Sequence, residues 1–221
     1  IVHFAQINKR DGFFIAGKEQ DDHFSWQKLC GKRVLVDHFF QPLAMFKYAL
    51  HKQGIDYSSI EVIDAGDVDA IEQAFRNGEA DYVHMQGPAP QQLEYEGLGH
   101  VVAAVGDVIG DVAFSSLCAS PEWLQTDEAR AFMQAYREAQ RYVLQAPAED
   151  IAAAEREAGF FPSIHPEVLQ QTIAAYQALG CWSNDVRISQ QSYENLLDVF
   201  SFAGAIHERH AYEQAIVQPP E

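Results

Sequence analysis

Short apolar runs alternate with amphipathic segments through the first half of the chain. Residues 34–36 form an all-apolar run, Val-Leu-Val, of the kind that is buried on both faces of a parallel sheet. From Pro42 to Gly54 the apolar positions are spaced for one buried helical face, and Pro42 suits a first helical position because its missing N–H needs no partner there. This unit predicts a strand, a loop and a helix N-terminus at the sheet edge where ligands bind.

The same alternation continues along the chain and then stops. Further strands are predicted near 60–63, 81–85 and 100–105, with a helix over 68–77 and a short helix before Gly97. Strands alternating with helices at these lengths indicate βαβ crossovers and a mainly parallel sheet. An extended run over 111–119 follows. After it the pattern is almost wholly helical, with helices predicted over 127–144, 147–158, 166–179 and 189–203.

Two loops of the predicted α/β region carry candidate ligand-binding residues. The first follows the strand at 34–36 and the second follows the strand at 81–85, so both should lie at the carboxyl edge of the sheet. One of the two phenylalanines is expected to pack under the next helix, while the other offers a flat ring to a ligand. The candidates are Asp37, His38, Phe39, Phe40, Gln41, Met85, Gln86 and Gly87.

Net charge and composition argue against several classes of binding partner and several kinds of site. The formal charge of −17 argues against nucleic acid and against an anionic membrane surface. No apolar run approaches the roughly 20 residues of a membrane helix. The three cysteines are far apart in sequence, which disfavours a disulfide framework or a zinc site but leaves one disulfide possible. Three isolated thiols are most often buried small residues.

The familiar catalytic and cofactor motifs lack their required spacing or context. The glycines at 97 and 99 precede a strand instead of following one, so they do not form a dinucleotide fingerprint. His207 and His210 are only three residues apart, which fits a solvated polar stretch better than a metal site. His38 could serve as an acid–base group, but no nucleophile or paired carboxylate lies beside it in sequence, so a ligand contact is preferred. We therefore expect no catalytic residue, no cofactor and no metal.

Taken in order, several segments resemble the second lobe of substrate-binding proteins of ABC importers. The resemblance is to the subfamily for aliphatic sulfonates, nitrate and thiamine pyrimidine precursors, which also includes the fungal thiamine-pyrimidine synthase. The similar segments are QINKRDGFFIAGKE, LCGKRVLVDHFFQPLAMFKYALHKQGID, IEQAFRNGEADYVHMQGPAPQQLEYEG and DVAFSSLCASPEWLQ, followed by the helical ending NDVRISQQSYENLLDVFSFAGAI.

The resemblance implies an α/β, type II periplasmic-binding-protein-like fold in which a first lobe is missing. Residues 1–30 are then crossover strands and a loop from that lobe, residues 31–119 are the α/β ligand-binding lobe, and residues 120–221 are a C-terminal helical region packing on the first lobe. Ligand would be held between lobes by hinge closure.

The implied function is that of an extracytoplasmic, periplasmic solute-binding component of an ABC importer. Its partners would be a small-molecule ligand and the permease and ATPase, with contact to the membrane only through the permease. The chain would be a monomer whose signal upstream of Ile1 has been removed.

Two departures from the family pattern bear on the ligand and on enzyme activity. The family's glycine-serine turn is replaced by residues 37–41, and Asp37 would repel an anion. A thiamine-pyrimidine-precursor-like or related heterocycle is therefore favoured over sulfonate or nitrate. The cysteine-rich stretch of the fungal synthase is not seen, which disfavours that activity. The alternatives are a biosynthetic enzyme on the same scaffold and a ligand-sensing domain.

Overall fold

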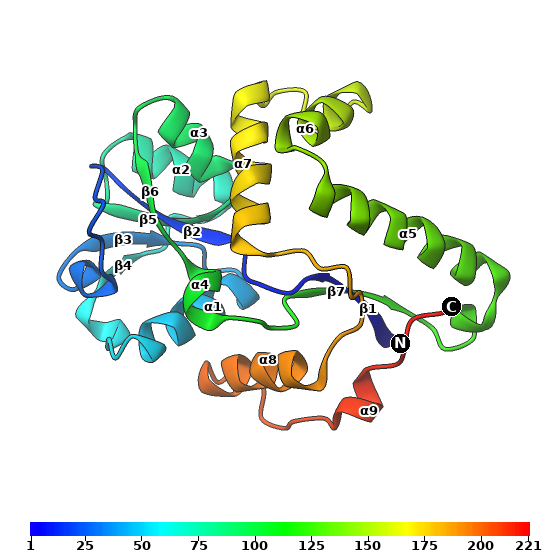
Figure 1. Cartoon of the computed structure of the whole chain (residues 1–221). Helices are drawn as coiled ribbons and strands as arrows, with labels where there is room; N and C mark the ends of the chain where they lie inside the picture. Colours follow the sequence, from blue (N-terminus) through cyan, green and yellow to red (C-terminus); the bar gives the residue numbers. More distant parts are fainter.

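The computed structural model describes residues 1–221, and its main element is a five-stranded sheet (Figure 1). The strand order is β4-β3-β5-β2-β6, and only β2 runs antiparallel to its neighbours, so the predicted mainly parallel sheet is confirmed. β2 hydrogen-bonds between β5 and β6, which makes it part of this sheet. The strands are β2 (Phe13–Gly17), β3 (Arg33–Val36), β4 (Glu61–Ile63), β5 (Tyr82–Gln86) and β6 (His100–Ala104).

Helices cover both faces of this sheet, because successive strand side chains point to opposite sides. On one face Val34 and Val36 pack against α1, and on the other Leu35 packs against α2. The helix α4 lies where the sequence predicted only the end of a strand and a turn. These helices are α1 (Phe40–Lys52), α2 (Val68–Arg76), α3 (Ala89–Tyr95) and α4 (Val105–Ile109), with 3-10 turns η1 (Trp26–Leu29), η2 (Tyr57–Ser59) and η3 (Trp123–Gln125).

The helix α1 begins two residues before the predicted start at Pro42. Its N-cap is Phe39, whose backbone is extended, and the first helical hydrogen bond runs from the Leu43 N–H to the Phe39 carbonyl. The Asp37 carboxylate accepts the Phe39 N–H at 2.8 Å and so sets the turn that starts the helix. Pro42 still falls in the first turn, where its missing N–H leaves no carbonyl unpaired.

A second, two-stranded sheet joins the α/β lobe to the C-terminal helices. β1 (Val2–Asn8) pairs antiparallel with β7 (Ser115–Ala119), with Val2 opposite Ala119 and Asn8 opposite Ser115. The predicted extended run over 111–119 thus becomes a strand only in its second half. Figure 1 shows both chain ends close together beyond this sheet, away from the lobe.

Four of the five C-terminal helices follow their predicted positions within two residues at each end, whereas the short fifth helix, Tyr212–Ala215, was not predicted. Two of them contact the α/β lobe: Tyr176 of α7 stacks on Phe14 of β2, and Phe202 of α8 stacks on His51 of α1. Packing of the remaining helices on a first lobe stays a prediction. The helices are α5 (Asp127–Gln145), α6 (Ala148–Glu157), α7 (Pro166–Leu179), α8 (Gln190–Phe202) and α9 (Tyr212–Ala215).

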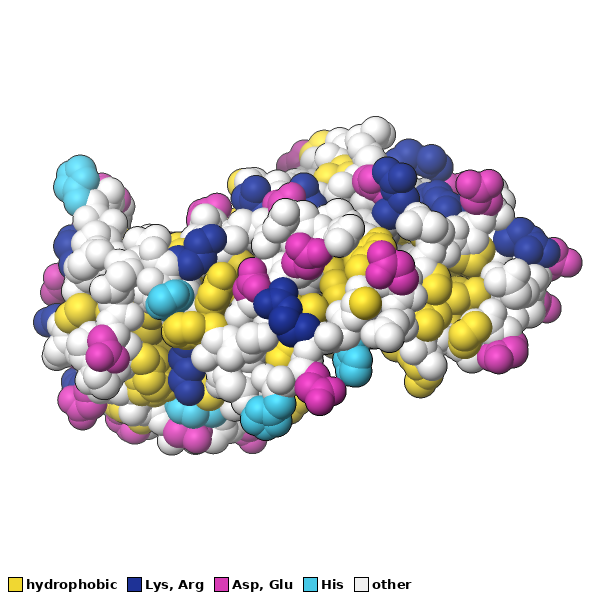
Figure 2. Space-filling model, turned by 90° about the horizontal axis from the view of Figure 1, so that it is seen from below, with side chains coloured by type: hydrophobic (Ala, Val, Ile, Leu, Met, Phe, Trp, Pro, Cys, Tyr) yellow, Lys and Arg dark blue, Asp and Glu magenta, His cyan; other side chains and the backbone are white.

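The surface leaves several large apolar side chains exposed. Figure 2 shows hydrophobic side chains on both halves of the face seen from below, interspersed with acidic and basic ones. Cys30 and Cys118 are exposed and Cys181 is buried, and all three thiols are free. The expectation of buried cysteines is therefore wrong for the first two. None of the helices has the length and apolar character to cross a bilayer.

Candidate ligand-binding cleft

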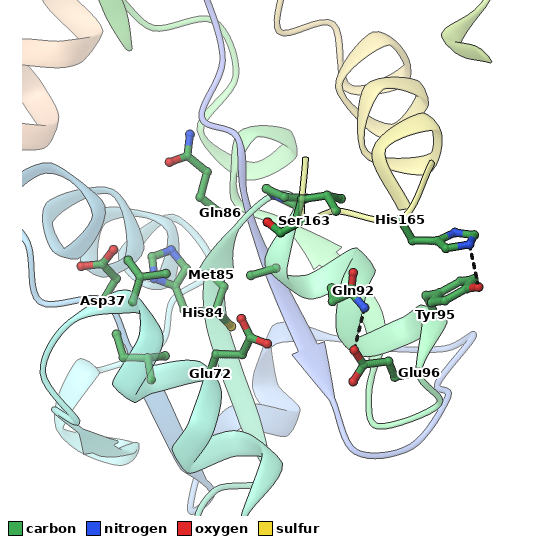
Figure 3. Close-up of a pocket in the computed structure, with 16 residues that line it drawn as sticks. Asp37, Glu72, His84, Met85, Gln86, Gln92, Tyr95, Glu96, Ser163 and His165 are labelled. Atoms are coloured by element: carbon green, nitrogen blue, oxygen red, sulfur yellow. Dashed lines mark hydrogen bonds between the residues drawn. The ribbon is translucent and has the colours of Figure 1, made fainter. Parts of the chain in front are cut away.

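Two adjoining cavities open at the carboxyl edge of the parallel strands. The first has a volume of about 650 Å³ and the second of about 620 Å³. Asp37, Val68 and Gln86 line both cavities, so the two form one continuous depression, which we call the cleft. Its volume suits a small organic molecule. Figure 3 is a close-up of the first cavity, with Asp37 and Glu72 on one side and Tyr95 and Glu96 on the other.

The structure brings seven of the eight predicted residues to this cleft. The exception is Phe40, whose ring packs on Phe200 of α8 with centroids 5.2 Å apart. Phe39 is 77% exposed and lines the second cavity. Phe40 is still 55% exposed and packs against α8, so the expectation that one phenylalanine packs under the following helix is wrong, while Phe39 is free to meet a ligand. The residues at the cleft are Asp37, His38, Phe39, Gln41, Met85, Gln86 and Gly87.

Hydrogen bonds fix the loop that follows β3. The ring of His38 contacts the Val36 carbonyl through Nδ1 at 2.8 Å. The amide of Gln41 donates to the Phe114 carbonyl at 2.6 Å, which ties the start of α1 to the chain leading into β7. Asp37 keeps its second carboxylate oxygen without an intramolecular partner, since only Oδ1 accepts the Phe39 N–H. The carboxylate is thus the part of this loop that can bind something else.

The loop after β5 contributes mainly shape. Met85 is 2% exposed and belongs to the core beneath α2 and α3, so it forms part of the floor. A Cβ on Gly87 would lie 2.9 Å from Thr172 Cγ2 and 3.0 Å from the Tyr176 hydroxyl oxygen. The close approach that requires a glycine is therefore made by α7. Gln86 remains exposed at the junction of the two cavities.

His84 lines the first cavity and was not predicted. Its side chain is fully buried, stacked on Phe13 with centroids 4.8 Å apart and tilted against Phe46 with centroids 5.0 Å apart. Neither ring nitrogen has a hydrogen-bond partner. Burial, and secondarily the nearby His38, lower the pKa of His84 from 6.5 to about 3, so the ring is neutral at ordinary pH.

The remaining walls carry polar side chains from other elements. Asp64 and Asp67 follow β4, which is the third parallel strand ending at this edge, so the rule that selected residues 37–41 could also have found them. Ser163 and His165 come from the loop before α7, and Figure 3 shows this loop closing the cavity above α3. His165 stacks on Tyr95 with ring centroids 4.6 Å apart. No sequence pattern connects this loop with the strands.

The matched family model defines the class of protein. The model described as "NMT1/THI5 like" matches residues 1–150, and the chain belongs to this family, which confirms the resemblance seen in the sequence. A curated relative, "Putative binding protein YtlA" of Bacillus subtilis (strain 168), is 29% identical over 220 residues, which are 98% of this chain and 65% of the relative. The chain therefore spans about two thirds of the length of the curated relative it matches.

Solved structures show the fold. The periplasmic aliphatic sulphonate binding protein SsuA of Escherichia coli matches with a TM-score of 0.72 at 18% identity, over 99% of this chain and 69% of that one. The alkanesulfonate-binding protein SsuA of Xanthomonas axonopodis pv. citri, bound to MOPS, matches with a TM-score of 0.70 at 17% identity, over 98% and 73%. The desulfurization enzyme DSZB matches with a TM-score of 0.58 at 12% identity, over 98% and 76%. The periplasmic-binding-protein-like fold is thus confirmed.

Proposed function

We propose that this chain forms the second lobe and helical region of a solute-binding protein that delivers a small organic ligand to an ABC importer. The observation that carries the proposal is the cleft: both loops chosen from the sequence meet there, beside an exposed aromatic ring and an unpaired carboxylate oxygen. Binding-protein-like relatives in sequence and in fold support it.

The ligand that suits this cleft is flat and carries hydrogen-bonding groups. Phe39 offers a ring for stacking, and Gln86 can donate or accept. A heterocycle of the thiamine-pyrimidine-precursor type has these features, whereas sulfonate or nitrate would approach Asp37 at a cost. An enzyme on the same scaffold remains the second candidate, because DSZB shares the fold.

The proposed setting is extracytoplasmic, with a permease and an ATPase as partners and the binding protein itself a monomer. The supporting fact is that solved structures of similar fold are described as a periplasmic binding protein and as the ligand binding component of an ABC-type import system. Closure of a first lobe over the cleft would then complete the site.

A thermal-shift screen of small heterocycles followed by calorimetry tests the proposal. Both Phe39→Ala and Gln86→Ala should weaken binding of a ligand so found. The effect of Phe39→Ala should be well over tenfold, because the aromatic contact and its buried area are both lost. Phe40→Ala is the matched control, since that ring packs on α8 outside the cleft. If neither Phe39→Ala nor Gln86→Ala changes the affinity, the ligand binds outside the cleft.

A further inference from the structure

The charged side chains that line the cleft are acidic apart from histidines. No lysine or arginine lines either cavity. The carboxylates are Asp37, Asp64, Asp67, Glu72 and Glu96, contributed by the turn after β3, the turn after β4, α2 and the end of α3.

Two of these five carboxylates share one neighbouring cation. Arg76 pairs with Glu72 at 2.6 Å and also with Glu96. The hydrogen bond from Arg76 lowers the pKa of Glu96, so this carboxyl stays ionised. Most of the uncompensated negative charge therefore lies on the three aspartates of the second cavity, where the basic group nearby is the ring of His38, with Nδ1 3.8 Å from Asp64 Oδ1.

Helix N-termini would ordinarily make this edge attractive to anions. Here carboxylates of the chain already hold those positions. Asp37 accepts a backbone N–H at the start of α1, and Asp67 accepts the Ala70 N–H at 2.9 Å at the start of α2. Asp64 similarly accepts the Gly66 N–H at 3.0 Å. An anionic ligand would meet the free oxygens of these carboxylates instead of unoccupied donors.

A separate observation indicates that the cleft is built to hold a polar molecule. His84 is fully buried in the wall of the first cavity with both ring nitrogens unpartnered. Buried polar groups in native proteins nearly always have partners, so an unpaired one beside a cavity points to a ligand contact. Since this ring is neutral, it adds no positive charge that would offset the aspartates.

We propose that the cleft selects an organic cation: a small flat molecule with a protonated amine or amidine group held by Asp37 and Asp64, and its ring against Phe39. This inference rests on the proposed function and specifies the charge of the ligand. These three residues line the second cavity, and Asp37 also lines the first cavity, whose wall includes His84. The exposed face of an aromatic ring also attracts a cation.

Three probes with the same ring and different charge test the inference on the full chain: benzamidinium, benzamide and benzenesulfonate, at a fixed salt concentration of about 0.15 M. Benzamidinium at about ten times its Kd should raise Tm by roughly 3–6 °C, whereas benzamide should act more weakly and benzenesulfonate should have no effect. Stabilisation by benzenesulfonate equal to that by benzamidinium, or none by benzamidinium, overturns the inference.

Matched variants separate the cleft from the overall negative charge. Asp37→Asn and Asp64→Asn keep an oxygen acceptor for the Phe39 and Gly66 N–H groups but remove the charge, and each should weaken benzamidinium binding at least about tenfold. Asp22→Asn removes an exposed charge at the opposite edge of the sheet and should have no effect. Equal effects from all three variants would refute selection by the cleft.

The outcome also distinguishes the two proposals. If the heterocycle screen finds a neutral or anionic ligand whose binding needs Phe39, the solute-binding function stands and the charge inference fails. If the ligand does not depend on any cleft residue, the proposed function fails as well.

Discussion

Replacing His84 with leucine is expected to stabilise the folded chain, more strongly at pH 5 than at pH 8. The imidazole is fully buried and makes no hydrogen bond, so the folded state bears the desolvation cost of two polar nitrogens. Leucine has a similar volume and no polar atoms. Removing an unsatisfied buried polar group is worth about 1–3 kcal/mol, which is the gain expected at pH 8.

The dependence on pH follows from the pKa of His84, which burial lowers from 6.5 to about 3. Below pH 6.5 the His84 ring binds a proton in the unfolded chain but stays neutral in the folded chain. Stability is therefore fully present above pH 6.5 and is lost as pH falls towards 3. Between pH 8 and pH 5 the loss from this one group is about 2 kcal/mol. The leucine variant does not lose this stability, because it has no titrating group at this position.

The pH dependence of wild-type stability alone does not reveal this loss, because Asp11 changes the free energy of unfolding with pH in the opposite direction. Its carboxyl is fully buried, and burial raises its pKa from 3.8 to about 7 against the opposing hydrogen bond from the Phe13 N–H. Stability from Asp11 is therefore present below pH 3.8 and is lost as pH rises through 7. The informative quantity is the difference between variant and wild type at each pH.

Urea unfolding at pH 5 and pH 8, followed by tryptophan fluorescence, measures this difference. The stabilisation by His84→Leu should exceed its pH 8 value by about 2 kcal/mol at pH 5, with an unchanged m value. Phe13→Leu is the control, since it alters the same aromatic cluster without removing the titrating ring. A His84→Leu effect that is equal at the two pH values would refute the reasoning, as would an NMR titration of His84 near pH 6.5.

Three further predictions concern backbone and buried groups around the cleft. Asp11→Asn keeps an acceptor for the Phe13 N–H at 2.6 Å and removes the charge, so the variant should be more stable than wild type at pH 8, by up to about 4 kcal/mol, and lose this advantage towards pH 4 in the same urea assay. Gly106→Ala would place a Cβ 2.4 Å from the Asp11 carbonyl oxygen and should cost about 2 kcal/mol or more in free energy of unfolding; an unchanged urea midpoint contradicts this. Gly87→Ala should be destabilising alone but less so in combination with Tyr176→Phe, because the hydroxyl oxygen lies 3.0 Å from the added Cβ; strictly additive costs would exclude this contact as the cause.

The alternation of strands and helices could be predicted because each element is encoded locally. The apolar run at 34–36 and the caps and glycines around the helices are sufficient to place most boundaries within two residues. The position of β2 could not be predicted in this way. Residues 13–17 pair with residues 82–86 and 100–104, and periodicity gives no information on pairing across such a separation.

The cleft could be predicted in part for a similar reason. Residues that directly follow parallel strands must lie at one edge, so Asp37 and Gln86 could be brought together from sequence alone. His84 is the middle residue of β5, where its neighbours look like ordinary core, and its lack of partners is visible only in three dimensions. The loop at 163–165 reaches the cleft because of how α7 packs, and nothing local in the sequence indicates that.

The packing of α7 also limits which parts of the molecule can move when a ligand binds. The Tyr176 hydroxyl donates towards the carbonyl oxygens of Gly12 and Gly87, at 3.3 and 3.5 Å, and its ring stacks on Phe14. These contacts join α7 to the central strands of the sheet. Because the loop carrying His165 immediately precedes α7, it is fixed to the same body as the strand ends that form the floor of the cleft. Under the proposed function, closure over a ligand therefore has to come from a part of the protein other than α7 and the loop that precedes it.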